Sequence, residues 1–291
     1  MELGGVWIPL ITPFRDGAVD LASLRRLVDR LIPAGIAGLV AGATTGESLT
    51  LTEEELEAVV RATAEAARGR VPVLAGAGGA DTRRAIAAVQ RAERAGADGI
   101  LSICPFFVRP DQRGIRAHFE AVAASTGLPV VLYNNPVRVG VRMENDTIRT
   151  LAALPNVVGL KDCAGDVLQS QELLLDPPPG FAVLSGEDAL FYPMLALGAA
   201  GGILAAAHWA TEAFVATWRA VEENDHRRAR ALWARLAPGV RLLFAEPSPA
   251  PLKGVLHALG VIASPEVRLP LCAASEGLRV RLGALRELEP A

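Results

Sequence analysis

The sequence predicts an α/β protein, a closed (β/α)8 TIM barrel with a C-terminal helical extension. Short apolar runs alternate with longer amphipathic segments, and eight such pairs fit within a chain of 291 residues. The short runs are continuously apolar, which is typical of parallel strands that are covered on both faces. Eight β-α units in this length favour a closed barrel over an open doubly wound sheet.

The predicted strands are apolar runs that end at polar or turn-forming residues. Short runs of this kind are consistent with buried strands. In chain order, we predict strands at Val6–Thr12, Gly38–Gly42, Val71–Ala75, Gly99–Cys104, Val130–Tyr133, Val157–Lys161, Ala182–Ser185 and Gly202–Ala206.

Between the strands lie amphipathic segments, and several of them begin with a residue that can cap a helix. The clearest start is at Thr52, because Glu55 follows at the spacing of a capping box and the first turn is acidic. The predicted barrel helices cover Asp20–Pro33, Thr52–Arg68, Asp81–Gly96, Asp111–Thr126, Glu144–Leu154, Asp166–Leu175 and Asp188–Gly198.

After about residue 207 the alternation stops and the pattern becomes helical throughout. We interpret Thr211–Glu223 as the eighth barrel helix. Three further helices are predicted at His226–Phe244, Pro251–Leu259 and Ser275–Leu288. The expected division is a barrel at residues 1–224 and a C-terminal helical region at residues 225–291.

Composition and motifs argue against several classes of protein. A net charge of −3 predicts no nucleic-acid partner. No apolar run approaches the length of about 20 residues that a membrane helix needs, and the N-terminus lacks a secretory signal, so we expect a cytoplasmic protein without a membrane partner. The three cysteines and four histidines lack metal-ligand spacing, so no metal site is expected. No dinucleotide motif follows the first strand.

Lys161 is the first candidate catalytic residue. The chain has two lysines, Lys161 and Lys253, and its other cationic side chains, histidines aside, are arginines. Lys161 ends an apolar strand, where a charged group is costly unless it is paired or loses its proton. A neutral amine in that place suits Schiff-base chemistry, which a guanidinium cannot perform. The alternative is an ion pair with Asp162 or another carboxylate.

The other candidates lie at the same predicted rim, because active sites of such barrels lie at the C-terminal ends of the strands. Thr44 and Thr45 follow the second strand, Tyr133 ends the fifth, and Arg138 lies just beyond it. Each also has a plain structural interpretation. The threonines can cap a helix, Tyr133 can be a packing residue, and Arg138 can be a surface charge.

Three motifs together resemble those of the dihydrodipicolinate synthase / N-acetylneuraminate lyase family. They are Gly42-Ala43-Thr44-Thr45-Gly46-Glu47-Ser48, Tyr133-Asn134-Asn135-Pro136 and Gly159-Leu160-Lys161-Asp162. The similarity keeps the family's order and spacing and runs nearly end to end. It implies a barrel with a C-terminal helical region and class I aldolase activity through a lysine Schiff base. It also implies pyruvate or a related 2-oxo acid as substrate, no cofactor, and a homo-oligomer, either a dimer or a tetramer.

The resemblance assigns three residues to the chemistry. Lys161 is expected to attack the pyruvate carbonyl and to form the imine and then the enamine. Tyr133 is expected to transfer protons as a general acid and base. Thr44 is expected to relay protons from Tyr133.

Four further residues are implied to bind substrate. Thr45, with nearby backbone N–H groups, is expected to hold the pyruvate carboxylate, and Arg138 to bind the carboxylate of an incoming small aldehyde. The backbone carbonyl of Ile203 is expected to face the lysine, and Gly186 to allow backbone to come close.

Two features are similar to the synthase branch of the family, namely Arg138 within Pro136–Gly140 and the proline-rich stretch Glu246–Lys253. They imply condensation of pyruvate with L-aspartate 4-semialdehyde, which gives 4-hydroxy-tetrahydrodipicolinate for lysine biosynthesis.

One position departs from the synthase pattern. Phe107 stands where the synthases have a second tyrosine, which reaches into the neighbouring subunit's site and completes a proton relay. This favours an alternative, another pyruvate-type aldolase or dehydratase acting on a 2-keto-3-deoxy sugar acid or N-acetylneuraminate. A third hypothesis is a non-catalytic binding protein on the same scaffold, against which the joint presence of Lys161, Tyr133, Thr44 and Thr45 speaks.

Overall fold

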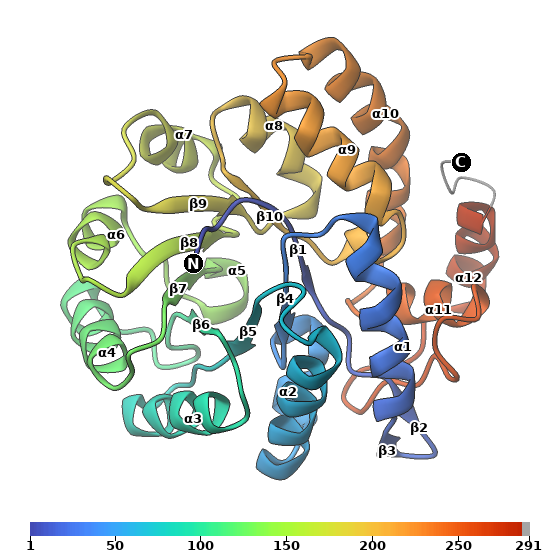
Figure 1. Ribbon diagram of the computed structural model, residues 1–291, viewed down its shortest axis with the longest axis horizontal. Helices are drawn as coiled ribbons and strands as arrows, with labels where there is room; N and C mark the ends of the chain where they lie inside the picture. The colour runs from blue at the N-terminus through green and yellow to red at the C-terminus, as the bar shows by residue number, and fades with distance from the viewer. Residues whose placement is uncertain (287–291) are drawn as a thin grey trace.

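The computed structural model describes residues 1–286, and in it eight parallel strands close into a barrel surrounded by helices (Figure 1). The predicted TIM barrel is therefore confirmed. Around the barrel the order is β1-β10-β9-β8-β7-β6-β5-β4, and β4 pairs again with β1. The strands are β1 (Gly5–Pro9), β4 (Gly38–Ala41), β5 (Val73–Gly76), β6 (Gly99–Ile103), β7 (Val130–Asn134), β8 (Val157–Asp162), β9 (Ala182–Ser185) and β10 (Gly201–Ile203).

All eight predicted strands exist, with changes at their ends. β5 begins at Val73, after Pro72, because proline has no N–H to donate to the sheet. β10 ends at Ile203, because the chain then turns into the short 3-10 helix Ala206–His208. A small antiparallel pair, β2 (Phe14–Arg15) and β3 (Ala18–Val19), was not predicted, since two-residue strands are too short to show a periodic pattern.

The barrel helices also follow the prediction. They are α1 (Leu21–Leu31), α2 (Glu53–Ala67), α3 (Thr82–Arg94), α4 (Gln112–Ala124), α6 (Asn145–Ala152), α7 (Val167–Leu175), α8 (Phe191–Ala196) and α9 (Thr211–Glu222). The capping box of α2 is present, with Glu55 N–H donating to the Thr52 hydroxyl and Thr52 N–H donating to the Glu55 carboxylate. The one-turn helix α5 (Pro136–Val139) was not predicted.

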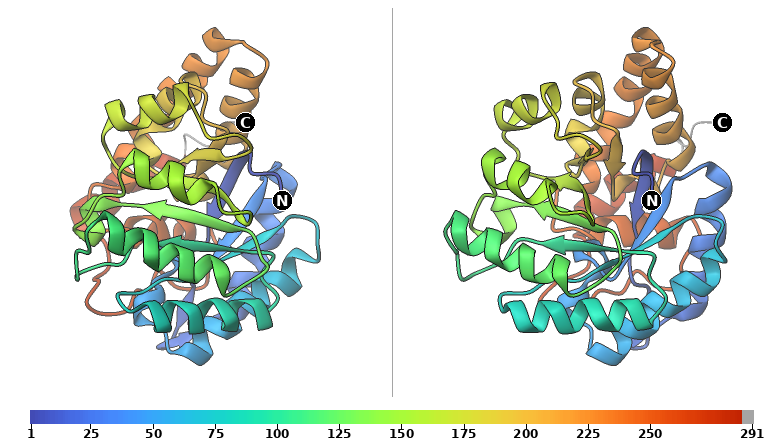
Figure 2. Two further views of the ribbon diagram at one scale, coloured as in Figure 1. Left: turned by 90° about the vertical axis from the view of Figure 1, so that its left-hand side faces the viewer. Right: turned by 60° about the vertical axis from the view of Figure 1, so that its left-hand side comes forward.

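Three helices follow the barrel, α10 (His226–Leu243), α11 (Ala250–Ala258) and α12 (Glu276–Gly283). The last ends earlier than predicted, and residues 287–288 of the prediction lie outside the described residues. α10 packs on α9 and α8, and the chain then returns so that α11 and α12 lie on the α1 side of the barrel (Figures 1 and 2). There, Ala263 N–H donates to the Ser23 hydroxyl of α1. Among the described residues, no helix is both long and apolar enough to cross a membrane.

Apolar side chains form two separate layers in the barrel. One fills the space between strands and helices and includes Val6 and Ile8 of β1. The other lies inside the barrel and includes Trp7, Leu74 and Leu184. This follows from strand geometry, because successive side chains point to opposite faces. The interior is therefore packed, and space for a ligand remains at the strand ends.

The packing around Trp7 yields a stability prediction. A Cβ added at Gly38 would lie 2.2 Å from the Trp7 ring, which is itself fully buried. Gly38→Ala should therefore destabilise the fold by about 1–3 kcal/mol through overpacking. Gly127→Ala is a matched control, because an added Cβ meets nothing within 4 Å and φ is not positive there. Urea unfolding midpoints measure both, and an unchanged midpoint for Gly38→Ala would contradict the prediction.

Candidate active site

A cavity of about 920 Å³ opens at the C-terminal ends of the barrel strands. All seven residues predicted to act on or bind substrate line it, namely Thr44, Thr45, Tyr133, Arg138, Lys161, Gly186 and Ile203. They come from the ends of β4, β7, β8, β9 and β10 and from the segments that follow them. The barrel thus brings together residues that lie far apart in the sequence, as the position of active sites in this fold requires.

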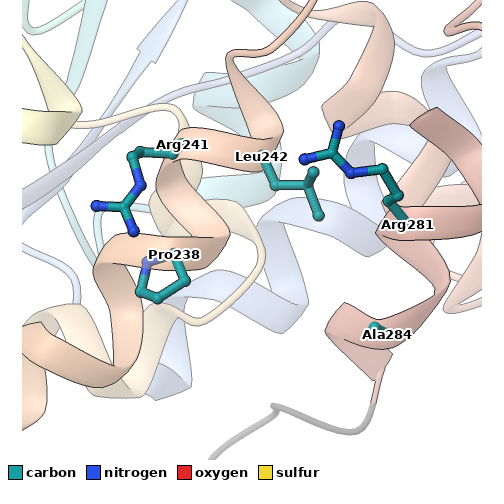
Figure 3. Close-up of a pocket in the computed structure, with 5 residues that line it drawn as sticks. All are labelled: Pro238, Arg241, Leu242, Arg281 and Ala284. Atoms are coloured by element: carbon teal, nitrogen blue, oxygen red, sulfur yellow. The ribbon is translucent and has the colours of Figure 1, made fainter.

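A second hollow, of about 640 Å³, lies between α10 and the C-terminal helix α12. Figure 3 shows Arg241 and Arg281 beside it, together with Pro238, Leu242 and Ala284. None of these five side chains is a nucleophile or an acid-base group that titrates near neutral pH. The cavity at the strand ends is therefore the candidate active site.

Lys161 and Tyr133 are direct neighbours across the β7–β8 ladder. The Lys161 Nζ atom lies 4.4 Å from the centroid of the Tyr133 ring, and both side chains are at least 95 % buried. Asn135 Nδ2 donates to the Tyr133 hydroxyl at 3.1 Å. The lysine amine and the phenol are thus held side by side in a site largely closed to water, where proton transfer between them and a bound carbonyl compound is geometrically possible.

Asp162 is not the partner of Lys161, so the alternative of a simple ion pair between them is wrong. Its carboxylate accepts from the Ser170 hydroxyl at 2.5 Å and from Ala164 N–H at 2.9 Å. Consecutive residues of a strand point to opposite faces, so Lys161 points into the barrel and Asp162 points out toward α7.

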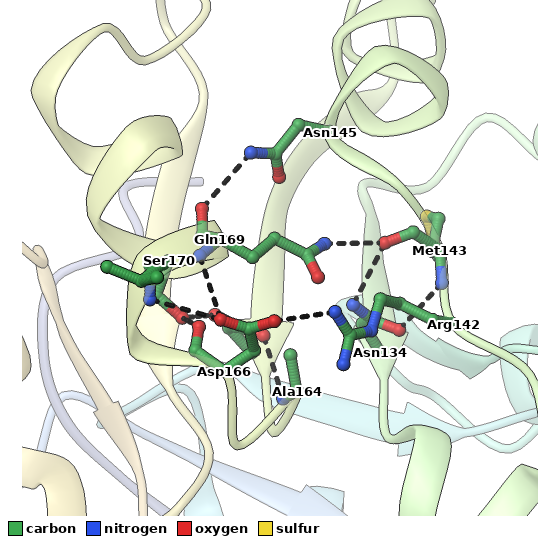
Figure 4. Close-up of polar contacts among 10 residues, drawn as sticks. Asn134, Arg142, Met143, Asn145, Ala164, Asp166, Gln169 and Ser170 are labelled. Carbon is green, nitrogen blue, oxygen red and sulfur yellow. Dashed lines mark hydrogen bonds and ion pairs between the residues drawn. The ribbon is translucent and has the colours of Figure 1, made fainter.

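A polar network ties the ends of β7 and β8 to the helices outside them (Figure 4). Asn134 Nδ2 donates to the Met143 carbonyl, and Met143 N–H donates back to Asn134 Oδ1. Gln169 Nε2 donates to the same carbonyl at 2.7 Å, and Arg142 pairs with Asp166 at 2.6 Å. These bonds hold the end of β7, from which Tyr133 projects, against the Arg142–Met143 segment, which is itself tied to the start of α7.

The charge state of Lys161 depends on its buried neighbours. Burial lowers its pKa, negative charge on Tyr133, Cys163 and Asp188 raises it, and the net direction is upward. Burial also raises the pKa of Tyr133, and that of Cys163 to about 12. The pKa of Asp188 is raised by burial to about 7, so Asp188 is the member of this group that ionises near neutral pH. An upward pKa favours the ammonium, so the neutral amine that Schiff-base chemistry requires stays a prediction for Lys161.

Thr44 and Thr45 begin the short 3-10 helix Thr44–Gly46, directly after β4. The first N–H groups of such a turn have no partner within it and point away from its N-terminal end. The turn is also bonded to the segment after β1, since the Thr12 hydroxyl donates to the Gly46 carbonyl at 2.7 Å. Among the described residues, no hydrogen bond joins Thr44 to Tyr133, so the proton relay through Thr44 stays a prediction.

Arg138, Gly186 and Ile203 also line the cavity, and their roles toward substrate and Lys161 stay predictions. Arg138 lies exposed at the cavity mouth on α5, whose N-cap residue Asn135 accepts from Arg138 N–H at 3.1 Å. A Cβ at Gly186 would lie 2.4 Å from Cys163 Sγ and 2.7 Å from Lys161 Cγ, so a larger residue would displace the lysine. Ile203 ends β10 and is fully buried.

Phe107 lies outside this cavity, with its side chain 91 % exposed. Its backbone is in the left-handed region at φ 72°, and its N–H donates to the Val139 carbonyl. A left-handed non-glycine residue is strained. The segment after β6 therefore presents an exposed aromatic ring without a hydroxyl.

Sequence reasoning assigned no role to three cavity residues, Asn135, Cys163 and Asp188. Asn135 was part of a recognised motif, but its bond to the Tyr133 hydroxyl depends on the turn into α5. Asp188 could have been found as the second carboxylate after a predicted strand, Ala182–Ser185. The burial of Asp188 near Lys161 could not have been found in this way, because that burial follows from closure of the barrel.

The fold and the site together define a (β/α)8-barrel enzyme whose buried lysine and tyrosine lie at the strand ends. The chain belongs to the dihydrodipicolinate synthetase family, whose family model matches residues 2–287.

Individual relatives resemble the chain over nearly its full length. It is 46 % identical to 4-hydroxy-tetrahydrodipicolinate synthase 2 of Clostridium acetobutylicum, over 97 % of this chain and 99 % of that protein. It is 44 % identical to 4-hydroxy-tetrahydrodipicolinate synthase of Neisseria gonorrhoeae, over 97 % of each. The chloride-inhibited dihydrodipicolinate synthase of Acinetobacter baumannii, solved in complex with pyruvate, superposes with a TM-score of 0.95 at 36 % identity, over 99 % of each chain.

Asp188→Asn tests the charge balance of the site. The amide keeps the oxygen that accepts from Ala206 N–H but removes the negative charge that favours the Lys161 ammonium. The pKa of Lys161 should therefore fall, and the pH at which borohydride begins to trap a pyruvate adduct should drop by about one unit.

Glu120→Gln is the control for this measurement, because it also removes one negative charge but lies exposed on α4, outside the cavity. Its trapping profile should follow that of the unmodified protein. A shift of the Asp188→Asn profile to higher pH, or no shift, would show that another group sets the charge of Lys161.

Proposed function

We propose that this protein condenses pyruvate with L-aspartate 4-semialdehyde to 4-hydroxy-tetrahydrodipicolinate through a Schiff base on Lys161. The observation that carries the proposal is the position of the Lys161 amine, buried 4.4 Å from the Tyr133 ring centroid in the cavity at the strand ends. The relatives of the chain that bear the name of this synthase support the same reaction.

The first step is formation of an imine. The Lys161 amine, once it has lost its proton, adds to the C2 carbonyl of pyruvate, and water leaves. Tyr133 keeps its proton at neutral pH, because burial raises its pKa, so it acts first as an acid toward the departing oxygen. The imine then draws electrons from C3, which loses a proton to give the enamine. No cofactor is required, since the imine itself accepts the electron pair.

The carboxylate of pyruvate fits the turn at Thr44 and Thr45. Free N–H groups at the start of a turn bind anions well. The Thr45 hydroxyl adds a further donor, and Thr44 lies on the same turn, where it relays protons for Tyr133. At the end of β10, the backbone carbonyl of Ile203 faces the lysine in this proposal. Gly186 has no Cβ and so leaves space for the Lys161 side chain.

The aldehyde partner enters from the mouth of the cavity, where Arg138 lies. Its planar guanidinium suits a carboxylate, and among the described residues no acidic side chain pairs with it. The enamine C3 attacks the aldehyde carbon, and the resulting oxygen takes a proton. The amino group of the same substrate then attacks C2, which closes the ring and releases Lys161.

We further propose a division into a catalytic barrel, residues 1–224, and a C-terminal helical region, residues 225–291, in a cytoplasmic homo-oligomer, either a dimer or a tetramer. The exposed ring of Phe107 supports an oligomer, because a strained backbone that presents a bare aromatic ring is favourable when another surface covers it. The missing hydroxyl at this position is then replaced in the relay by water.

A coupled assay tests the reaction directly. Pyruvate and L-aspartate 4-semialdehyde are supplied together with dihydrodipicolinate reductase, and consumption of NADPH is followed. Turnover is expected, and Lys161→Ala should abolish both turnover and borohydride trapping of pyruvate, because no other lysine is among the described residues that line the cavity.

Two outcomes would contradict this proposal. Folded protein that traps pyruvate but does not turn over the semialdehyde would indicate another aldehyde, and 2-keto-3-deoxy sugar acids and N-acetylneuraminate would then be assayed. Trapping that persists in Lys161→Ala would exclude Lys161 as the nucleophile.

Arg138→Ala should mainly impair use of the aldehyde. The loss of one charged hydrogen-bonding partner should raise the KM for the semialdehyde by about tenfold or more, while the trapping of pyruvate stays unchanged. Gln112→Ala is a control outside the cavity. A rise confined to the pyruvate KM would show that Arg138 serves the first substrate instead.

A further inference from the structure

The second lysine of the chain is buried deeper than the first. Lys253, on α11, has no exposed side-chain surface, and its Nζ atom lies 2.5 Å from Glu47 Oε1, which is also buried. The same ammonium donates to the Glu266 carbonyl at 2.8 Å and lies 4.1 Å from the centroid of the Phe14 ring. Burial lowers the pKa of Lys253 to about 8, and the charge of Glu47 opposes that shift. Near neutral pH Lys253 is therefore mostly protonated.

Glu47 directly follows the Thr44–Gly46 turn and lines the active-site cavity. Its backbone is in the left-handed region at φ 53°, a conformation that costs free energy for any residue with a Cβ. Its N–H donates to the Thr44 carbonyl at 3.0 Å. A left-handed conformation of this kind persists where surrounding contacts stabilise it. At Glu47 the side-chain carboxylate makes those contacts.

Both oxygens of that carboxylate are held by the C-terminal region. Oε1 faces Lys253, and Oε2 accepts from Arg268 N–H at 2.9 Å. The Arg268 guanidinium then forms a two-point pair with Glu55 and donates to the Thr50 carbonyl at 3.0 Å. The segment between the threonines and α2 is thus tied to the C-terminal region at Glu47, by Lys253 and Arg268, and at Thr50, by Arg268.

A buried ion pair is a weak source of stability, because desolvation of two charges offsets most of their attraction. Its better-supported use is to specify one geometry among several. The geometry specified here is that of the Thr44–Gly46 turn, since Glu47 ends this turn and lines the same cavity as Thr44 and Thr45. If the pair served only to stabilise the fold, apolar side chains of similar volume would do so at least as well.

We propose that Lys253 and Glu47 are positioning residues for the proposed reaction, which hold the Thr44–Gly46 turn in the geometry that receives the carboxylate of the 2-oxo acid. This inference rests on the proposed role of that turn in binding pyruvate. It makes the C-terminal helical region part of the substrate site, although the region contributes no reacting group.

The double variant Glu47→Gln, Lys253→Met tests the proposal. It removes both charges at once and so avoids a lone buried charge, which would be strongly destabilising. Circular dichroism should show an intact fold. The pyruvate concentration that gives half-maximal borohydride trapping should rise by about tenfold, the effect of one charged hydrogen bond. The KM for the aldehyde, measured at saturating pyruvate, should change by less than about threefold, a difference under 1 kcal/mol.

Glu55→Gln is the matched control. It breaks the half-buried pair of Glu55 with Arg268 in the same network and leaves Glu47 and Lys253 in contact. It should lower the urea midpoint and leave pyruvate trapping unchanged, whereas a merely structural role for Glu47 and Lys253 would affect both variants alike. If the double variant does not fold, Glu47→Asp, which keeps the charge but is one methylene shorter, should still raise the half-saturating pyruvate concentration.

The outcomes separate this inference from the proposed function. If the unmodified protein does not trap pyruvate at all, the proposed function fails. If it does, and the folded double variant, or Glu47→Asp in its place, saturates at the same pyruvate concentration, the positioning role is overturned and the proposed function stands.

Discussion

Closure of the barrel by β1 is the constraint on which the rest of the structure depends. β1 pairs with β10 on one side and with β4 on the other, so the first and last strands of the barrel become neighbours. Every strand then ends at the same rim, and the interior fills with side chains. Residues from five strand ends meet in one cavity, because parallel pairing around a closed barrel brings the C-terminal ends of the strands together.

Within that cavity, burial and charge act together on the lysine. The parallel register places Lys161 beside Tyr133, and alternation along β8 sends Asp162 outward to Ser170. Asp188 remains as the carboxylate that acts on the amine near neutral pH, since its own pKa is raised to about 7. The pKa of Lys161 thus reflects two opposing effects, burial and the electrostatic interaction with its neighbours.

The C-terminal region reaches the same rim from outside the barrel. Lys253 and Arg268 hold Glu47 by both carboxylate oxygens, and the turn that bears Thr44 and Thr45 is continuous with Glu47. One end of the cavity is thus formed by the strand ends, and the turn there is held by residues that lie beyond the barrel. Figure 1 shows the arrangement, with α11 on the side of the barrel where α1 and β4 lie.

The sequence by itself determined the class of fold, the order of its elements and the identity of the central residues. Continuous apolar runs and amphipathic segments are local patterns, so they predicted eight strands and their helices, and motifs at the strand ends pointed to Lys161, Tyr133 and Thr44. Tertiary structure alone decided the partners of these residues. The hydrogen bond between Arg268 and Glu47 joins residues 221 positions apart, and the burial of Asp188 against Lys161 needs a closed barrel. Such contacts are absent from local patterns because they form between side chains that only folding brings together.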